Sequence, residues 1–187
     1  MALTVGLIGI GGMGHGIGAN LLSRGYRLRV LAHRSRTLVD DLISRGATET
    51  SSAQEMAKEA DVVVLCVTGS PQVRDVMFSD GGLISGVRSG MLVIDCSTGE
   101  PDVVAQVGEE LEGRGADFVD APLARTPVEA AAGKLNTMVG ASDPAFARAR
   151  PILEAFCENI FHMGPVGAGT RTKLLNNLIT MGQAACE

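Results

Sequence analysis

Short apolar runs alternate with amphipathic stretches along the whole chain. The runs are rich in β-branched residues and predict buried strands over residues 4–10, 28–32, 61–67, 91–96, 117–120 and 136–139. The stretches between them have helical spacing and predict helices over residues 12–23, 37–45, 53–59, 71–78, 101–114 and 143–158. This alternation predicts an α/β fold with a doubly wound, mostly parallel sheet and helices on both faces.

Glycine and proline stand where such helices would end and begin. Pro71 and Pro101 occupy the first positions of two predicted helices, and Gly25 and Gly46 follow two others, where a left-handed C-cap favours glycine. After residues 164–167 a further helical pattern begins and continues to the end of the chain without a C-cap signal. We therefore expect a last helix that belongs to a fragment or is covered by something else.

The composition is that of a folded protein. The chain has 187 residues, of which 45% are hydrophobic and 20% charged, which is enough to bury a core and excludes a disordered tail, a collagen-like fibre and a disulfide-stapled miniprotein. The four cysteines lack C-x-x-C and zinc spacing, so we expect reduced thiols, no metal site and a cytoplasmic location. Neither a basic leader nor a long apolar run predicts a signal peptide or a membrane span.

Charge is distributed unevenly along the chain. The net charge is -5, which argues against a general nucleic-acid binder. Residues 1–39 nevertheless contain no acidic residue and five arginines, namely Arg24, Arg27, Arg29, Arg34 and Arg36. This asymmetry predicts a local anion site in the first quarter of the chain.

A glycine motif at the start of the chain predicts what that anion is. Gly9, Gly11 and Gly14 form a G-x-G-x-x-G between the first predicted strand and the first predicted helix. In that position Gly9 allows a tight turn, Gly11 lets the backbone approach a pyrophosphate, and Gly14 lets the helix pack closely on the strand. The motif, with Gly12 and Met13 inside it, therefore predicts dinucleotide binding at the amino end of the helix.

The end of the second predicted strand indicates which dinucleotide. An acidic residue there would bind the ribose hydroxyl of NAD, whereas arginine accommodates the 2′-phosphate of NADP. The sequence has His33, Arg34, Ser35 and Arg36 at this point and no acidic residue before Asp40. We expect NADP to be preferred over NAD, with Arg34 as the main contact and its neighbours in support.

Four motifs together resemble the β-hydroxyacid dehydrogenase family, which includes the 3-hydroxyisobutyrate dehydrogenases. They are the segments GLIGIGGMG (6–14), IDCSTGEP (94–101), FVDAPLART (118–126) and GAGTRTKLLNN (167–177). The resemblance implies that Lys173 is the catalytic lysine and that Asn176 or Asn177 orients the substrate. It also implies that Val67, Thr68 and Thr98 lie along the cofactor.

The third motif departs from the family pattern. Where the family has Val-Ser-Gly-Gly, this chain has Leu123, Ala124, Arg125 and Thr126. An arginine at this place is similar to the sulfolactaldehyde reductase branch, whose substrate carries a sulfonate. Since guanidinium offers several fixed donors to an oxyanion, we expect Arg125 and Thr126 to anchor an anionic substrate.

The resemblance implies an NAD(P)-dependent oxidoreductase that interconverts a small 3-hydroxyacid and its semialdehyde by hydride transfer. A sulfonate-specific reductase and a dinucleotide-binding module without turnover remain alternatives, because family members continue into an all-helical domain. We expect an NAD(P)-binding Rossmann domain at residues 1–165 and the start of an interdomain helix at 166–187, with that second domain missing. The expected partners are a small anionic substrate and further copies of the full-length enzyme, without nucleic acid or membrane.

Overall fold

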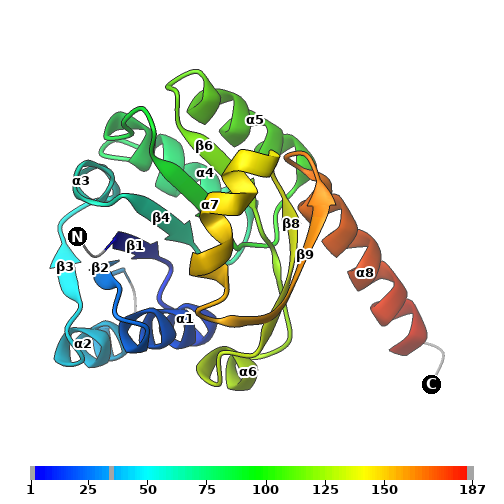
Figure 1. The fold of residues 1–187 in the computed structure, drawn as a ribbon, viewed down its shortest axis with the longest axis horizontal. Coiled ribbons are helices and arrows are strands. Elements are labelled where there is room, and N and C mark those ends of the chain that lie inside the picture. Colours follow the sequence, from blue (N-terminus) through cyan, green and yellow to red (C-terminus); the bar gives the residue numbers. More distant parts are fainter. Residues whose placement is uncertain (1–2, 34–35, 185–187) are drawn as a thin grey trace.

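A mixed sheet forms the centre of the molecule (Figure 1). The computed structural model describes residues 3–33 and 36–184, and in these ranges the chain forms nine strands: β1 (Thr4–Ile8), β2 (Arg27–Leu31), β3 (Thr48–Thr50), β4 (Val62–Leu65), β5 (Leu92–Asp95), β6 (Asp117–Asp120), β7 (Leu123–Ala124), β8 (Leu135–Gly140) and β9 (Cys157–Gly164). Their order is β3-β2-β1-β4-β5-β6-β8-β7, with β9 paired to β8. The first six strands are parallel, and β8 runs antiparallel to β6 and β7. This topology confirms the predicted doubly wound α/β fold.

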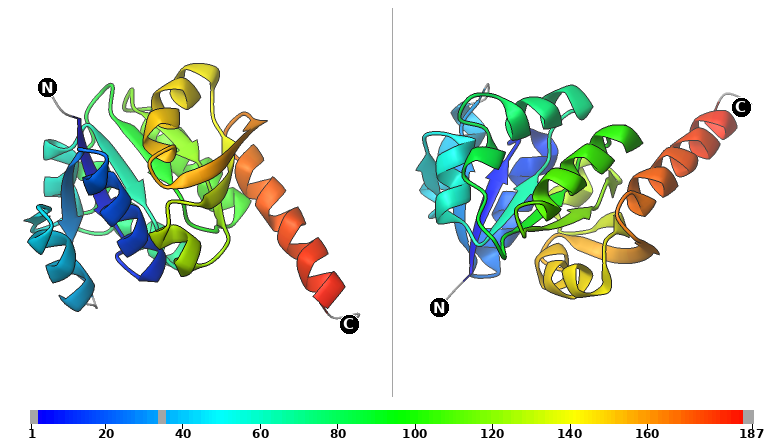
Figure 2. Two further views of the ribbon diagram at one scale, coloured as in Figure 1. Left: turned by 60° about the horizontal axis from the view of Figure 1, so that its bottom comes forward. Right: turned by 90° about the horizontal axis from the view of Figure 1, so that it is seen from above.

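Helices cover both faces of the sheet (Figures 1 and 2). They are α1 (Gly12–Ser23), α2 (Arg36–Ser44), α3 (Ala53–Glu59), α4 (Ser70–Phe78), α5 (Pro101–Glu112), α6 (Pro127–Ala131), α7 (Asp143–Leu153) and α8 (Ala168–Ala184), with a 3₁₀ turn at Leu83–Ser85. Side chains of α1, α2, α6 and α7 share one apolar cluster with the sheet, and those of α3, α4 and α5 share a second. The sheet is therefore buried on both sides, as continuous apolar strands require.

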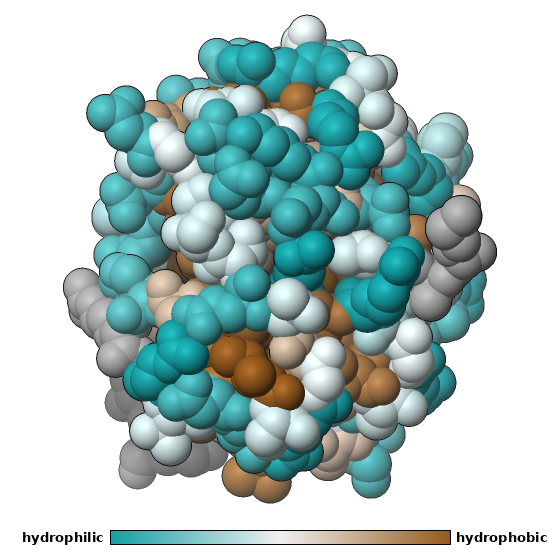
Figure 3. Space-filling model, turned by 90° about the vertical axis from the view of Figure 1, so that its left-hand side faces the viewer, coloured by the Kyte–Doolittle hydropathy of each residue, from teal (hydrophilic) through white to brown (hydrophobic). Residues whose placement is uncertain are grey.

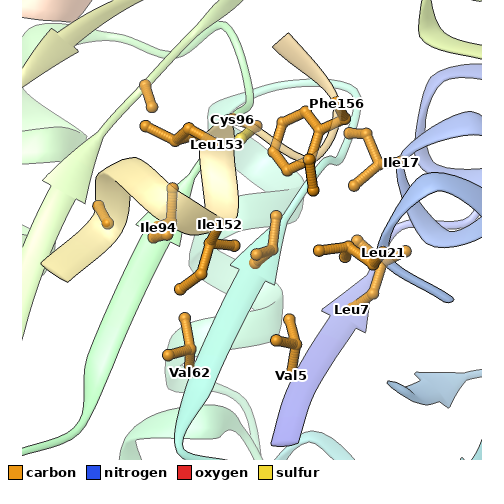
Figure 4. Packing of buried hydrophobic residues seen from close by; sticks show 14 of the residues in the cluster. Val5, Leu7, Ile17, Leu21, Val62, Ile94, Cys96, Ile152, Leu153 and Phe156 are labelled. Atoms are coloured by element: carbon orange, nitrogen blue, oxygen red, sulfur yellow. The ribbon is translucent and has the colours of Figure 1, made fainter. Parts of the chain in front are cut away.

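Alternation along each strand divides its side chains between the two clusters. Val62 and Val64 belong to the cluster beneath α1 and α7, whereas Val63 belongs to the cluster beneath α3 and α5. In the first cluster, Phe156 is completely buried and lies beside Ile17 of α1 (Figure 4). The fold thus fixes the carboxyl ends of β1, β4, β5 and β6 along one edge of the sheet.

Several boundaries differ from the sequence prediction. The helix predicted over 143–158 is too long, because α7 ends at Leu153 and the chain turns so that Phe156 enters the core and β9 can pair with β8. β3, β7, β9 and α6 were not predicted, since they are short or lie at exposed edges where the apolar pattern is weak. β1 stops at Ile8, two residues early, because Gly9 adopts a φ of 98°.

The last helix leaves the body of the molecule. α8 starts beside β8 and β9 and then projects away from the sheet (Figure 2). From Leu175 onward it exposes large apolar side chains, including Leu175, Leu178, Ile179 and Met181. None of the helices in the described ranges is long and apolar enough to cross a membrane.

Candidate functional site

The turn between β1 and α1 requires glycine at two positions. A Cβ on Gly9 would lie 2.2 Å from the carbonyl oxygen of Cys66, and its φ of 98° disfavours other residues. A Cβ on Gly14 would lie 2.0 Å from the carbonyl oxygen of Gly9. Both contacts are with backbone that cannot move aside, so these two glycines let α1 begin directly against the ends of β1 and β4.

Gly11 has a different environment. It is the N-cap of α1, makes no side-chain capping bond, and has no atom within 4 Å of the place its Cβ would occupy. Among the described residues, no side chain therefore caps the first N–H groups of α1. Such a cradle fits a pyrophosphate, since free N–H groups and the helix dipole both favour an anion.

A pocket of about 420 Å³ opens at this turn. Its walls come from the glycine turn, from the ends of β2 and β4, and from α2 and α4: Gly9, Ile10, Gly11, Gly12, Met13, Gly14, Leu31, His33, Val39, Cys66, Val67, Thr68 and Gln72. Eight of the residues predicted to bind the cofactor thus share one pocket. Gln72 was not predicted, and Arg34 and Ser35 fall outside the described residues.

Buried hydrogen bonds hold the loops that follow β4 and β5. The Ser97 hydroxyl accepts the Val67 N–H (3.0 Å), and the Asp95 carboxylate accepts the Ser97 N–H (2.9 Å). Burial raises the pKa of Asp95 to about 6. Thr98, at the end of this loop, is exposed and does not line the pocket, although its carbonyl oxygen lies near Gly69 in the loop after β4.

Asp120 anchors the amino end of α8. One carboxylate oxygen accepts the Gly167 N–H (2.6 Å) and the other accepts the Thr170 N–H (2.7 Å). Asp120 is 1% exposed, and burial raises the pKa of its carboxyl group. Glycine at position 169 completes the contact, because a Cβ there would lie 2.3 Å from the carbonyl oxygen of Met138. The sequence motif contained Asp120, but no pattern assigned it this role.

Lys173 lies one turn into the anchored helix. The residue is 8% exposed, and desolvation lowers the pKa of its ammonium group. Within the described part of the chain, no hydrogen bond or ion pair engages its Nζ. A lysine with a lowered pKa and an Nζ that no protein group engages can exchange a proton or a hydrogen bond with a ligand. Of the two predicted asparagines, Asn177 is partly buried one turn further along, whereas Asn176 is exposed.

Arg125 and Thr126 lie between β7 and α6. Nη1 of Arg125 donates to the Glu158 carboxylate (2.6 Å) and to the Lys134 carbonyl oxygen (2.5 Å), and the residue has a φ of 83°. Its Nε and Nη2 groups make no bond within the described ranges. The Thr126 hydroxyl belongs to a capping box, in which it donates to Glu129 and accepts from the Val128 N–H. Arg125 therefore keeps free donors, while the Thr126 hydroxyl is engaged.

Comparison with known proteins agrees with this arrangement. Residues 4–164 match the family described as the NAD binding domain of 6-phosphogluconate dehydrogenase. An NAD-dependent L-serine dehydrogenase of Pseudomonas aeruginosa is 38% identical over 92% of this chain and 58% of its own length. A 3-sulfolactaldehyde reductase of Escherichia coli is 32% identical over 95% of this chain and 59% of its own length.

A solved structure of a related enzyme shows a similar degree of sequence identity to this chain. The 3-hydroxyisobutyrate dehydrogenase of Mycobacterium tuberculosis superposes with a TM-score of 0.89 and 32% identity, covering 96% of this chain and 60% of the other. The chain thus spans somewhat less than two thirds of the length of these relatives. Since the family match covers residues 4–164 and these relatives match more than nine tenths of the chain, the chain belongs to the family of 6-phosphogluconate and 3-hydroxyisobutyrate dehydrogenases.

Proposed function

We propose that this chain is the dinucleotide-binding part of an NAD(P)-dependent oxidoreductase that interconverts a small 3-hydroxyacid and its semialdehyde. The observation that carries the proposal is Lys173, on a helix that Asp120 anchors at the end of β6. The residue is largely buried, and its Nζ has no hydrogen-bond or ion-pair partner among the described residues. In doubly wound sheets ligands bind at the carboxyl ends of the strands, where the glycine pocket also opens. The proposed division is a Rossmann domain at 1–165 and an interdomain helix from 166.

The residues of the chain suit the proton part of this reaction. The nicotinamide ring, when bound, supplies or accepts the hydride. In the reductive direction the ammonium of Lys173 donates a proton to the carbonyl oxygen of the substrate. In the oxidative direction its neutral amine takes the proton from the substrate hydroxyl. The lowered pKa of Lys173 favours this exchange, because it brings the two protonation states closer in free energy at neutral pH.

Polar groups on α8 and in the loop before α6 can orient an acidic substrate. We propose Asn177 for this role before Asn176, since its side chain is less exposed and lies one helical turn from Lys173. We propose Arg125 as the anchor of the substrate anion through its free Nε and Nη2 donors. Thr126 supports it by capping α6 and holding the loop, and its hydroxyl would reach the anion only by leaving Glu129.

For the cofactor we propose a preference for NADP. The support is the absence of an acidic residue from the segment that follows β2 and the presence there of Arg34 and Ser35. The predicted cytoplasmic location and the predicted oligomer of the complete enzyme stay predictions.

A turnover assay tests the proposed function. The chain is incubated with NADPH or NADH and a panel of small semialdehydes that carry a carboxylate or a sulfonate, and the absorbance of the reduced nicotinamide is followed. Consumption with a carboxylate substrate supports the 3-hydroxyacid assignment, and consumption with the sulfonate alone supports the sulfolactaldehyde type. Dinucleotide binding without turnover of any substrate would instead indicate a binding module.

Replacing Asp120 with asparagine is expected to lower kcat about tenfold and to leave dinucleotide affinity unchanged. The amide has one acceptor oxygen instead of two, so one buried N–H of α8 loses its partner at a cost of about 1–3 kcal/mol, and Lys173 loses its fixed position. Single-turnover rates and calorimetric titration would measure the two effects. Asp117→Asn is the matched control, since Asp117 starts the same strand and pairs with Arg148 at the surface. Equal losses of kcat in both variants would contradict the anchoring role.

Replacing Arg125 with alanine is expected to raise KM for an anionic substrate by roughly tenfold or more, because a charge-assisted hydrogen bond is lost. KM for an uncharged analogue of the same aldehyde should stay unchanged. Arg114→Ala serves as control, since it removes a surface arginine from the turn that follows α5. An Arg125→Ala enzyme that loses affinity for both substrates alike would show that the residue only supports the loop.

A further inference from the structure

Arg36 makes a complete set of ionic contacts at the start of α2. Its Nη1 and Nη2 bind the two carboxylate oxygens of Glu49 at 2.6 and 2.9 Å, and its Nε binds Asp40 at 2.8 Å. All three nitrogens of the guanidinium group are therefore engaged. Glu49 comes from β3, the edge strand, where it is paired in register with Val30 of β2.

This cluster stands beside the end of the pocket where the two dinucleotides differ. His33 and Val39, three residues before and after Arg36, both line the pocket. In folds of this kind the adenosine ribose lies at the end of the second strand, so the 2′ substituent would approach the start of α2. The side of the molecule that carries β3, α2 and α3 is mostly hydrophilic (Figure 3). The side chains of Arg36 and Glu49 are both partly exposed, so a charged group can reach the cluster.

The charges of the cluster oppose a second phosphate. One positive group faces two negative groups, and the Arg36 guanidinium holds the pKa of Glu49 below its usual range, so Glu49 stays ionised at neutral pH. A 2′-phosphate brings a charge of about -1.5 to -2 close to these carboxylates. To bind it, Arg36 has to leave Glu49. That is feasible because the side chain of Arg36 is 57% exposed and an exposed ion pair contributes little.

We propose that Glu49 is a specificity-determining residue that weakens NADP binding by holding Arg36 away from the 2′-phosphate. The inference rests on the proposed dinucleotide function of the pocket. Arg34 and Ser35 favour NADP, and Glu49, with Asp40, acts against it. The selectivity of the protein then depends on how far Glu49 and Asp40 neutralise Arg36.

Glu49→Gln tests the proposal, because it removes the charge and keeps the size of the side chain. We expect the dissociation constant of NADPH, measured by fluorescence titration, to fall about three- to tenfold, while that of NADH changes less than about twofold. Glu59→Gln is the matched control. Glu59 is another exposed acid bound to an arginine, Arg29, and its loss changes the net charge equally. Glu49→Asp keeps the charge and should keep the wild-type ratio of the two constants.

A double variant shows whether the effect passes through Arg36. In the Arg36→Ala background, Glu49→Gln should produce a clearly smaller gain in NADPH affinity than in the wild-type background. An unchanged NADPH to NADH ratio in Glu49→Gln, or an equal gain in Glu59→Gln, would overturn the proposal. Asp40→Asn removes the negative charge that binds Nε of Arg36, and it gives a second test if Glu49→Gln folds poorly. Wild-type protein that binds neither dinucleotide would instead overturn the proposed function.

Discussion

Lys173→Ala is expected to lower kcat by about 10²- to 10⁴-fold, the usual contribution of a positioned acid or base. Dinucleotide affinity should change little, because Lys173 does not line the glycine pocket. The protein should also stay folded, since Nζ of Lys173 makes no hydrogen bond or ion pair within the described residues and its desolvation opposes folding. Stopped-flow measurement of the chemical step, together with calorimetric titration of the dinucleotide, separates these effects.

The pH dependence of the two directions makes this prediction more specific. Burial lowers the pKa of Lys173, so its neutral form appears at lower pH than that of an ordinary lysine. The oxidative rate should rise with pH through this pKa, because the amine is the base, and the reductive rate should fall, because the ammonium is the acid. Lys173→Arg keeps the positive charge and should remove both inflections.

Lys58→Ala is the control for Lys173→Ala. Lys58 is an exposed lysine of α3 that pairs with Glu55, and its removal should leave the rate and both inflections unchanged. If Lys173→Ala retained the wild-type kcat with its substrate, the proton would have to come from another group, and the proposed role of Lys173 would be wrong.

The parts of the fold that the sequence predicted are those with a strong apolar period. The strands β1, β4 and β5 are buried along their whole length and β6 nearly so, which makes their composition distinctive. β9 has an alternating pattern, in which exposed Phe161 follows half-buried Ile160, and it was partly assigned to the preceding helix. Its pairing with β8 depends on a contact far along the chain, which local periodicity cannot reveal.

In the candidate site too, features set by local spacing could be predicted and features set by contacts between distant residues could not. The glycine turn could be read from spacing because each glycine meets a steric need of the backbone. The anchoring of α8 by Asp120 could not, since it joins groups 47 and 50 residues apart. The ion pair of Arg125 with Glu158 and the engagement of Arg36 by Glu49 likewise depend on which strands become neighbours. Patterns in the sequence indicate which residue types are available, and the topology decides which charges neutralise one another.

The second large effect is expected from the glycine turn, where two similar substitutions should have opposite consequences. Gly14→Ala places a Cβ 2.0 Å from the carbonyl oxygen of Gly9, so α1 has to move and we expect a loss of about 3 kcal/mol or more in the free energy of unfolding. For a chain of this size that corresponds to a fall in Tm of roughly 6–12 °C. Gly182→Ala, in the exposed outer part of α8, should leave Tm unchanged or raise it, because alanine favours helix.

Gly11→Ala should instead leave the fold intact and impair binding. No atom lies within 4 Å of the new methyl group, and the φ of -93° suits any residue, so we expect the free energy of unfolding to change by less than about 1 kcal/mol. The methyl group would occupy the space in which a pyrophosphate approaches the first N–H groups of α1, and the dissociation constant of the dinucleotide should rise about tenfold or more. Differential scanning calorimetry and titration with NADH and NADPH measure both quantities on the same samples. Wild-type affinity in Gly11→Ala would mean that the pyrophosphate does not bind at the amino end of α1, because no bound phosphate could make close contact with the backbone there and tolerate the added methyl group.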